Sequence, residues 1–312
     1  MGRTLRSQIV YLVFVTLTVG TSASSQKLGV SDYFARAGFA DPGREAEPLI
    51  PGIEPDALRL ANQLLAERDG LRVETPSRKG GLYLGGDVTN AMSRLEWIVG
   101  PENVKLLRLE PDGSVTLNLA KLARTARIEE SARGEVSRRL AKYISDNEGL
   151  LLFLQLAKSS HRYLLYLSKR APTEAGDQVV RSALNLDNNF DSRINPLRRN
   201  RVKLSQERPP AGFDSLVAIN PNALWFNMDR KKMVTPGNLT FHELAEAHAK
   251  LELGFDYLSQ GASPGAHDTA IKREERLLSQ RPLSNMVITK GTNRSFETAA
   301  EAQPFISRLN GQ

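Results

Sequence analysis

Hydrophobic positions along the first half of the chain recur at helical spacings, with a few short runs typical of strands. Residues three and four apart share one face of a helix, whereas short apolar runs bounded by turn residues favour strands. The pattern predicts helices over residues 54–69, 88–99, 120–145 and 148–159, and strands over residues 104–109, 114–119 and 163–168. The segment Pro111-Asp112-Gly113 lies between the first two strands, and an Asp-Gly turn there predicts a hairpin.

The second half of the chain combines a predicted strand pair with two helices. Residues 215–221 and 224–227 are apolar and β-branched or aromatic, and an Asn-Pro turn signal separates them. This pair is equally compatible with an ordinary core hairpin and with an edge that pairs with an extended peptide. A helix then spans His242, and a second helix over residues 267–278 follows a break rich in glycine and proline. We therefore expect an α+β fold, mainly helical with a small sheet, in which one helix packs on short strands.

The first 25 residues are typical of a secretory signal peptide. Arg3 and Arg6 precede an apolar run over residues 9–19, and small residues follow at 21–25. The run is too short for a comfortable membrane span. We expect cleavage near Ser24 and a secreted or periplasmic protein, with an uncleaved membrane anchor as the alternative.

Five regions are predicted along the chain. They are a signal peptide over residues 1–25, a linker or arm over 26–53, an N-terminal helical region over 54–103, a main domain over 104–282 and a polar, extended tail over 283–312.

Composition excludes several kinds of chemistry. The chain has 312 residues, 40% of them hydrophobic, which is enough apolar material for one or two cores. It has no cysteine, which excludes disulfides, thiol catalysis and sulfur-rich zinc sites. The net charge of +7 is spread diffusely, and the basic clusters have few aromatic neighbours, so no nucleic-acid partner is expected.

The strongest chemical signal is a cluster of histidines and carboxylates beginning at His242. On a helix Glu246 lies one turn after His242 and about 40° around the axis, so both side chains point to one place. Glu243 lies about 100° round from His242, where it can reach a water held by a metal without being a ligand itself. His248 does not lie on the helix face shared by His242 and Glu246, and it is expected to face solvent or pack on a neighbour.

A catalytic zinc ion takes three protein ligands and leaves one position open. His267, at the start of the second predicted helix, is the natural third donor, because the break before it lets the chain reverse onto the first helix. Glu274 shares a face with His267. It is therefore either a replacement ligand or an acceptor that orients His267.

Residues 147–282 resemble the minimal zincin domains of bacterial effector-type zinc metallopeptidases and related secreted, toxin-like domains. The likeness lies in Phe241-His242-Glu243-Leu244, in the block Gly265–Glu274, in Gln280-Arg281-Pro282, and upstream in Asn147-Glu148-Gly149-Leu150, Leu154-Gln155-Leu156-Ala157 and Tyr163. In that family two histidines of a His-Glu-x-x-His helix bind zinc, and the glutamate activates water. The resemblance implies zinc on His242 and the base on Glu243.

This chain departs from the family motif at the second ligand position, which holds Glu246 in place of histidine. Two functions of different class follow. One is an exported zinc peptidase that hydrolyses a protein or peptide substrate with Glu243 as general base. The other is a catalytically inactive module that binds peptide or envelope components through a structural metal site.

Overall fold

The computed structural model describes residues 80–118, 121–122, 133–188, 207–258, 264–280 and 289–311, with the side chains of 133–138 left out. The predicted signal peptide, the arm over 26–53 and the helix over 54–69 lie outside the described residues.

The main sheet has four strands in the order β1-β4-β8-β7. They are β1 (Gly81–Gly86), β4 (Arg162–Leu167), β8 (Ser215–Ile219) and β7 (Ala183–Asp187). The first three run parallel to one another, and β7 runs antiparallel to β8. Strand β7 therefore forms one edge of the sheet as described.

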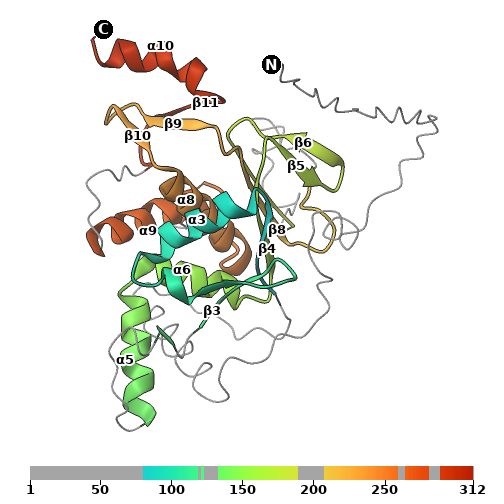
Figure 1. Ribbon diagram of the computed structural model, residues 1–312, viewed down its shortest axis with the longest axis vertical. Helices are drawn as coiled ribbons and strands as arrows, with labels where there is room; N and C mark the ends of the chain where they lie inside the picture. The colour runs from blue at the N-terminus through green and yellow to red at the C-terminus, as the bar shows by residue number, and fades with distance from the viewer. Residues whose placement is uncertain are drawn as a thin grey trace, which may run out of the picture.

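Four helices pack together beside this sheet (Figure 1). They are α3 (Val88–Val99), α6 (Glu148–Ala157), α8 (Pro236–Glu252) and α9 (Ala266–Gln280). A further helix, α5 (Arg133–Ser145), precedes α6. The mixed α+β architecture agrees with the sequence prediction, as do the helices over 88–99 and 148–159 within two residues at each end.

Alternating side chains of the strands divide the core into two clusters. In β4, Tyr163, Leu165 and Leu167 join the large cluster formed with the helices, whereas Leu164 joins a smaller cluster that includes Phe213. This is the period of two expected of a strand buried on both faces. Residues of β1 and α3 share the large cluster with α8, so residues on both sides of the predicted boundary at 103/104 belong to one core.

Three small sheets surround this centre. One pairs β2 (Leu107–Leu109) with β3 (Val115–Leu117), one pairs β5 (Arg170–Thr173) with β6 (Gly176–Val179), and one has β9 (Leu224–Asn227) between β10 (Lys232–Val234) and β11 (Asn293–Phe296). The β2-β3 pair is the predicted Asp-Gly hairpin, although residues 104–106 form a 3-10 turn instead of strand.

The predicted pairing of residues 215–221 with 224–227 is wrong. Strand β8 lies between β4 and β7, and β9 lies between β10 and β11, in a different sheet. The parallel strand β4 and the antiparallel strand β7 take the two edges of β8. Neither partner is joined to β8 by a tight turn, so no local turn signal marks the pairing. Neither strand therefore offers a free edge to a peptide, whereas β7 lies at the sheet edge.

The predicted extended tail is also wrong for residues 289–311, which contain β11 and α10 (Ala299–Leu309). Thr298 caps this helix by accepting a hydrogen bond from the backbone N–H of Glu301. The rings of Phe226, Phe296 and Phe305 pack against one another at centroid distances of 5.2 to 6.0 Å. Three aromatic rings thus attach an otherwise polar segment to the fold.

Within the described part of the chain, none of the helices has the length and apolar character needed to cross a bilayer.

Candidate metal centre

Helix α8 is buried along nearly its whole length and begins with a well-formed cap. The side chain of Thr235 accepts a hydrogen bond from the N–H of Asn238, and Pro236 occupies the first helical position. A Cβ atom added to Gly237 would come within 2.3 Å of the ring of Trp97 on α3. Glycine therefore lets α3 and α8 approach closely, which fixes the position of the helix that carries His242.

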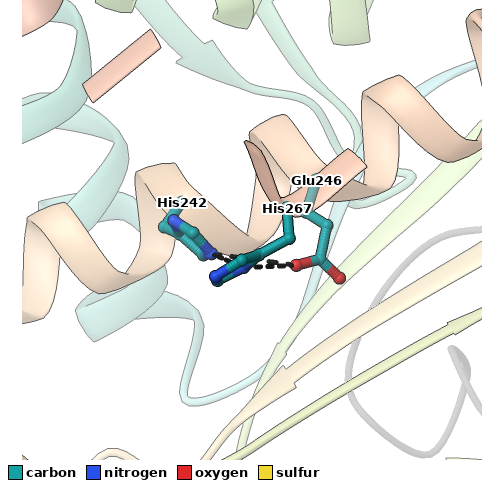
Figure 2. Close-up of side chains that lie close together, drawn as sticks. All are labelled: His242, Glu246 and His267. Carbon is teal, nitrogen blue, oxygen red and sulfur yellow. Dashed lines mark hydrogen bonds and ion pairs between the residues drawn. The ribbon is translucent and has the colours of Figure 1, made fainter. Parts of the chain in front are cut away.

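Three predicted ligands come together at one point (Figure 2). Nε2 of His242 lies 3.1 Å from Nδ1 of His267 and 3.7 Å from Oε2 of Glu246. The Nδ1 atom of His267 lies 3.5 Å from the same oxygen of Glu246. His242 and Glu246 are buried, and His267 is half-buried.

These separations fit a bound divalent cation. Nitrogen and oxygen ligands about 2.0 to 2.2 Å from a tetrahedral zinc ion lie about 3.3 to 3.6 Å from one another. The three observed separations, 3.1, 3.5 and 3.7 Å, bracket that range. Two imidazoles and a carboxylate are also the donors that zinc hydrolases use. The cluster could therefore hold a metal ion with little rearrangement.

Two sets of contacts place His267 opposite α8. The N–H groups of Ala266 and His267, at the start of α9, donate to the carbonyls of Asp256 and Tyr257 at 2.7 and 3.1 Å. Further along α9, the guanidinium of Arg273 donates to Glu148 and Gln155 of α6. Helix α9 is thereby held at its start and at its middle, as expected from the chain reversal that the sequence indicates.

Glu274 orients His242, and the prediction that it orients His267 or replaces a ligand does not match the geometry. Oε2 of Glu274 accepts hydrogen bonds from both the N–H and the hydroxyl of Thr289, each at 2.9 Å. The Thr289 oxygen lies 2.8 Å from Nδ1 of His242. Because the only hydroxyl hydrogen of Thr289 goes to Glu274, Nδ1 of His242 must be the donor. This leaves Nε2 of the neutral ring free to face the other two ligands.

Sequence reasoning missed Thr289, because a single threonine beyond the helices carries no recognisable signal. We expect Thr289→Val, which removes the hydroxyl at nearly constant size, to weaken metal binding about 10- to 100-fold. Competition titration against a zinc chelator would measure the change. An unchanged affinity in the folded variant would show that Thr289 does not orient the histidine.

The carboxylates around His242 make the ring strongly basic in the absence of metal. Burial opposes a charge there, but Glu246 and Glu274 outweigh it and raise the pKa of His242 to about 10. Burial alone would raise the pKa of the Glu246 carboxyl, but the two histidines and Lys250 lower it well below its usual value. The site therefore attracts positive charge, and a proton occupies Nε2 of His242 when no metal does.

A metal must displace this proton, so its apparent affinity should depend on pH. Below about pH 10 the histidine is protonated in the metal-free protein, and lowering the pH strengthens the competing proton. We expect the apparent zinc affinity to fall about tenfold for each unit of pH between 8 and 6. Calorimetry in buffers of different ionisation enthalpy should also detect about one proton released per zinc at neutral pH. Binding that is independent of pH would contradict a protonated His242.

Glu243 lies on the side of α8 that faces the edge strand β7. The side-chain amide of Asn185 donates to the backbone carbonyl and to Oε2 of Glu243, at 3.0 and 3.3 Å. Burial and the nearby charge of Glu246 raise the pKa of Glu243, against the opposing effects of His242 and Lys250. A carboxyl with a raised pKa holds a proton more readily than an exposed one, as a general base must.

His248 packs in the interior, the second of the two predicted outcomes. It is buried, and burial followed by the charge of Arg273 lowers its pKa well below the usual value. It is therefore neutral, and it does not belong to the donor cluster.

No protein-family model, curated protein or solved structure matches this chain.

Proposed function

We propose that the protein is an exported zinc-dependent peptidase in which His242, Glu246 and His267 hold the ion and Glu243 is the general base. The observation that carries this proposal is the set of three donor separations, 3.1, 3.5 and 3.7 Å, among atoms of two imidazoles and one carboxylate. The zincin-like sequence around His242 and the signal-like start of the chain are consistent with it.

In this proposal, His242, Glu246 and His267 would hold a zinc ion, which when bound would supply a Lewis acid for the substrate carbonyl and lower the pKa of a water molecule. Residues of the protein transfer the proton and position the reacting groups. Glu243 accepts the proton from the attacking water and passes it to the leaving amine. Asn185 holds the Glu243 carboxylate toward β7, and the pair of Thr289 and Glu274 keeps the His242 ring in the tautomer that leaves Nε2 free.

A peptide is the proposed substrate because the base lies beside a strand edge. Strand β7 is the edge strand of the described sheet, and Asn185, which contacts Glu243, lies in its middle. An extended peptide can add to such an edge through backbone hydrogen bonds. This arrangement would bring a peptide bond close to Glu243.

The alternative function is a catalytically inactive module with a structural metal. The replacement of histidine by Glu246 favours it, because a carboxylate ligand adds negative charge and weakens the metal as a Lewis acid. Low exposure of His242 and Glu246 is also typical of structural sites.

Zinc content and cleavage, measured together, test the proposal. The purified protein should contain one zinc per chain and should cleave members of an unstructured peptide library, with products identified by mass spectrometry. Removal of zinc by a chelator should stop cleavage, and added zinc should restore it. One zinc per chain without any cleavage would favour the inactive module, and protein that cannot be loaded with zinc would contradict both functions.

A further inference from the structure

The ligand carboxylate of Glu246 divides its two oxygens between the donor cluster and a lysine. Its Oε2 faces both histidine nitrogens, whereas Oε1 lies 2.7 Å from Nζ of Lys250. A carboxylate can bind a metal through one oxygen or through both. Because Lys250 holds Oε1, only Oε2 remains to face the histidines.

Lys250 is held in place by contacts from three parts of the fold. It lies one turn after Glu246 on α8, and its side chain is 12% exposed. Its Nζ atom lies 4.0 Å from Oδ2 of Asp187 on β7 and 5.5 Å from the ring centre of Tyr257, in the segment that precedes α9. An exposed ion pair of the same spacing is mobile and contributes little to stability. The Lys250 pair is instead buried beside the donors.

The lysine also changes the charge that the ligands present to a cation. Two neutral imidazoles and one carboxylate carry one negative charge, and the ammonium group in contact with Glu246 offsets it. The pair thus resembles electrically the neutral histidine that the His-Glu-x-x-His motif has at this position. A carboxylate ligand lowers the Lewis acidity of a metal, and pairing that carboxylate with an ammonium group makes this effect smaller.

We infer that Lys250 is a positioning residue that keeps Glu246 bound through one oxygen and cancels its charge, so that the Glu246–Lys250 pair replaces a histidine ligand. This inference rests on the proposed zinc site and adds to it a residue that determines how the carboxylate ligand acts.

The direction of the effect on zinc affinity distinguishes this role from a structural one. Lys250→Met keeps the aliphatic stem and removes the charge, which also removes repulsion toward a divalent cation. We expect zinc to bind about tenfold more tightly to this variant. The visible absorption of bound Co²⁺ should weaken, because a freed Oε1 raises the coordination number. Lys250→Arg should restore the wild-type Co²⁺ spectrum.

Lys142 of α5 supplies a matched control. Its Nζ atom lies 2.7 Å from Oδ2 of Asp146, four residues later and just after the helix ends, but its side chain is 73% exposed. Lys142→Met should leave zinc affinity and the Co²⁺ spectrum unchanged. Weaker or equal zinc binding by folded Lys250→Met, or an unaltered Co²⁺ spectrum, overturns the inference. Lys250→Gln gives the same readouts if the methionine variant does not fold. Wild-type protein that binds neither ion overturns the zinc site and the inference together.

Discussion

Replacing Glu243 by glutamine should lower peptide cleavage about 10²- to 10⁴-fold while the protein keeps its zinc. Glutamine has nearly the shape of glutamate but cannot accept a proton. Glu243 is outside the donor cluster, so its loss should leave the metal ligands in place. The measurement is the cleavage rate of one library peptide under saturating zinc, with the zinc content of the same sample determined in parallel.

Glu275→Gln is the control for this prediction. Glu275 lies on α9 close to Glu274, but its side chain is exposed and pairs with Lys290. This variant should cleave at the wild-type rate. If Glu243→Gln cleaved as fast as wild type, Glu243 would not be the base. If it lost its zinc, Glu243 would take part in metal binding.

Replacing His242 by alanine should remove the metal. A zinc site holds its ion with about 10 to 16 kcal/mol shared among its ligands, so loss of one ligand should weaken binding about a hundredfold or more. His242 is also more deeply buried than His267, and it is the ligand that contacts Thr289. Cleavage should fall below detection at limiting zinc, as measured by chelator competition and by the peptide assay.

The control for this variant is His161→Ala, which removes a half-buried histidine 3.7 Å from Asp214 and outside the donor cluster. It should bind zinc as wild type does. Because His242 is buried among carboxylates, its removal can reduce stability, so His267→Ala provides a second test at a more exposed ligand. Zinc retained at full affinity by a folded His267→Ala protein would exclude His267 as a ligand.

Local patterns predicted the helices of the fold better than its sheet. The apolar spacing of α3 and α6 and the cap residues Asp87 and Asn147 are readable in the sequence. Strand β1 is rich in glycine, and β7 alternates only two leucines with polar residues, so neither has a strong strand signal. The parallel pairing of β1 with β4 joins residues about eighty positions apart, which no local pattern can indicate.

In the metal centre, too, local sequence patterns indicate some of the residues, whereas contacts between distant segments do not show in the sequence. His242 and Glu246 were predictable because helix periodicity places them on one face, and His267 because a short break returns the chain to α8. Helix spacing relates Glu274 to His267, as a replacement ligand or as an acceptor, whereas in the structure Glu274 contacts Thr289, which lies beside His242 and comes from a later segment. Lys250 follows Glu246 at a spacing visible in the sequence, but only the structure shows that it is buried against the ligand.

Anomalous diffraction at the zinc absorption edge, on crystals of the zinc-loaded protein, would locate the ion among its ligands. We expect one strong peak per chain between Nε2 of His242, Nδ1 of His267 and Oε2 of Glu246, about 2.0 to 2.2 Å from each atom. A peak elsewhere, or no peak at this cluster, would contradict the proposed zinc site.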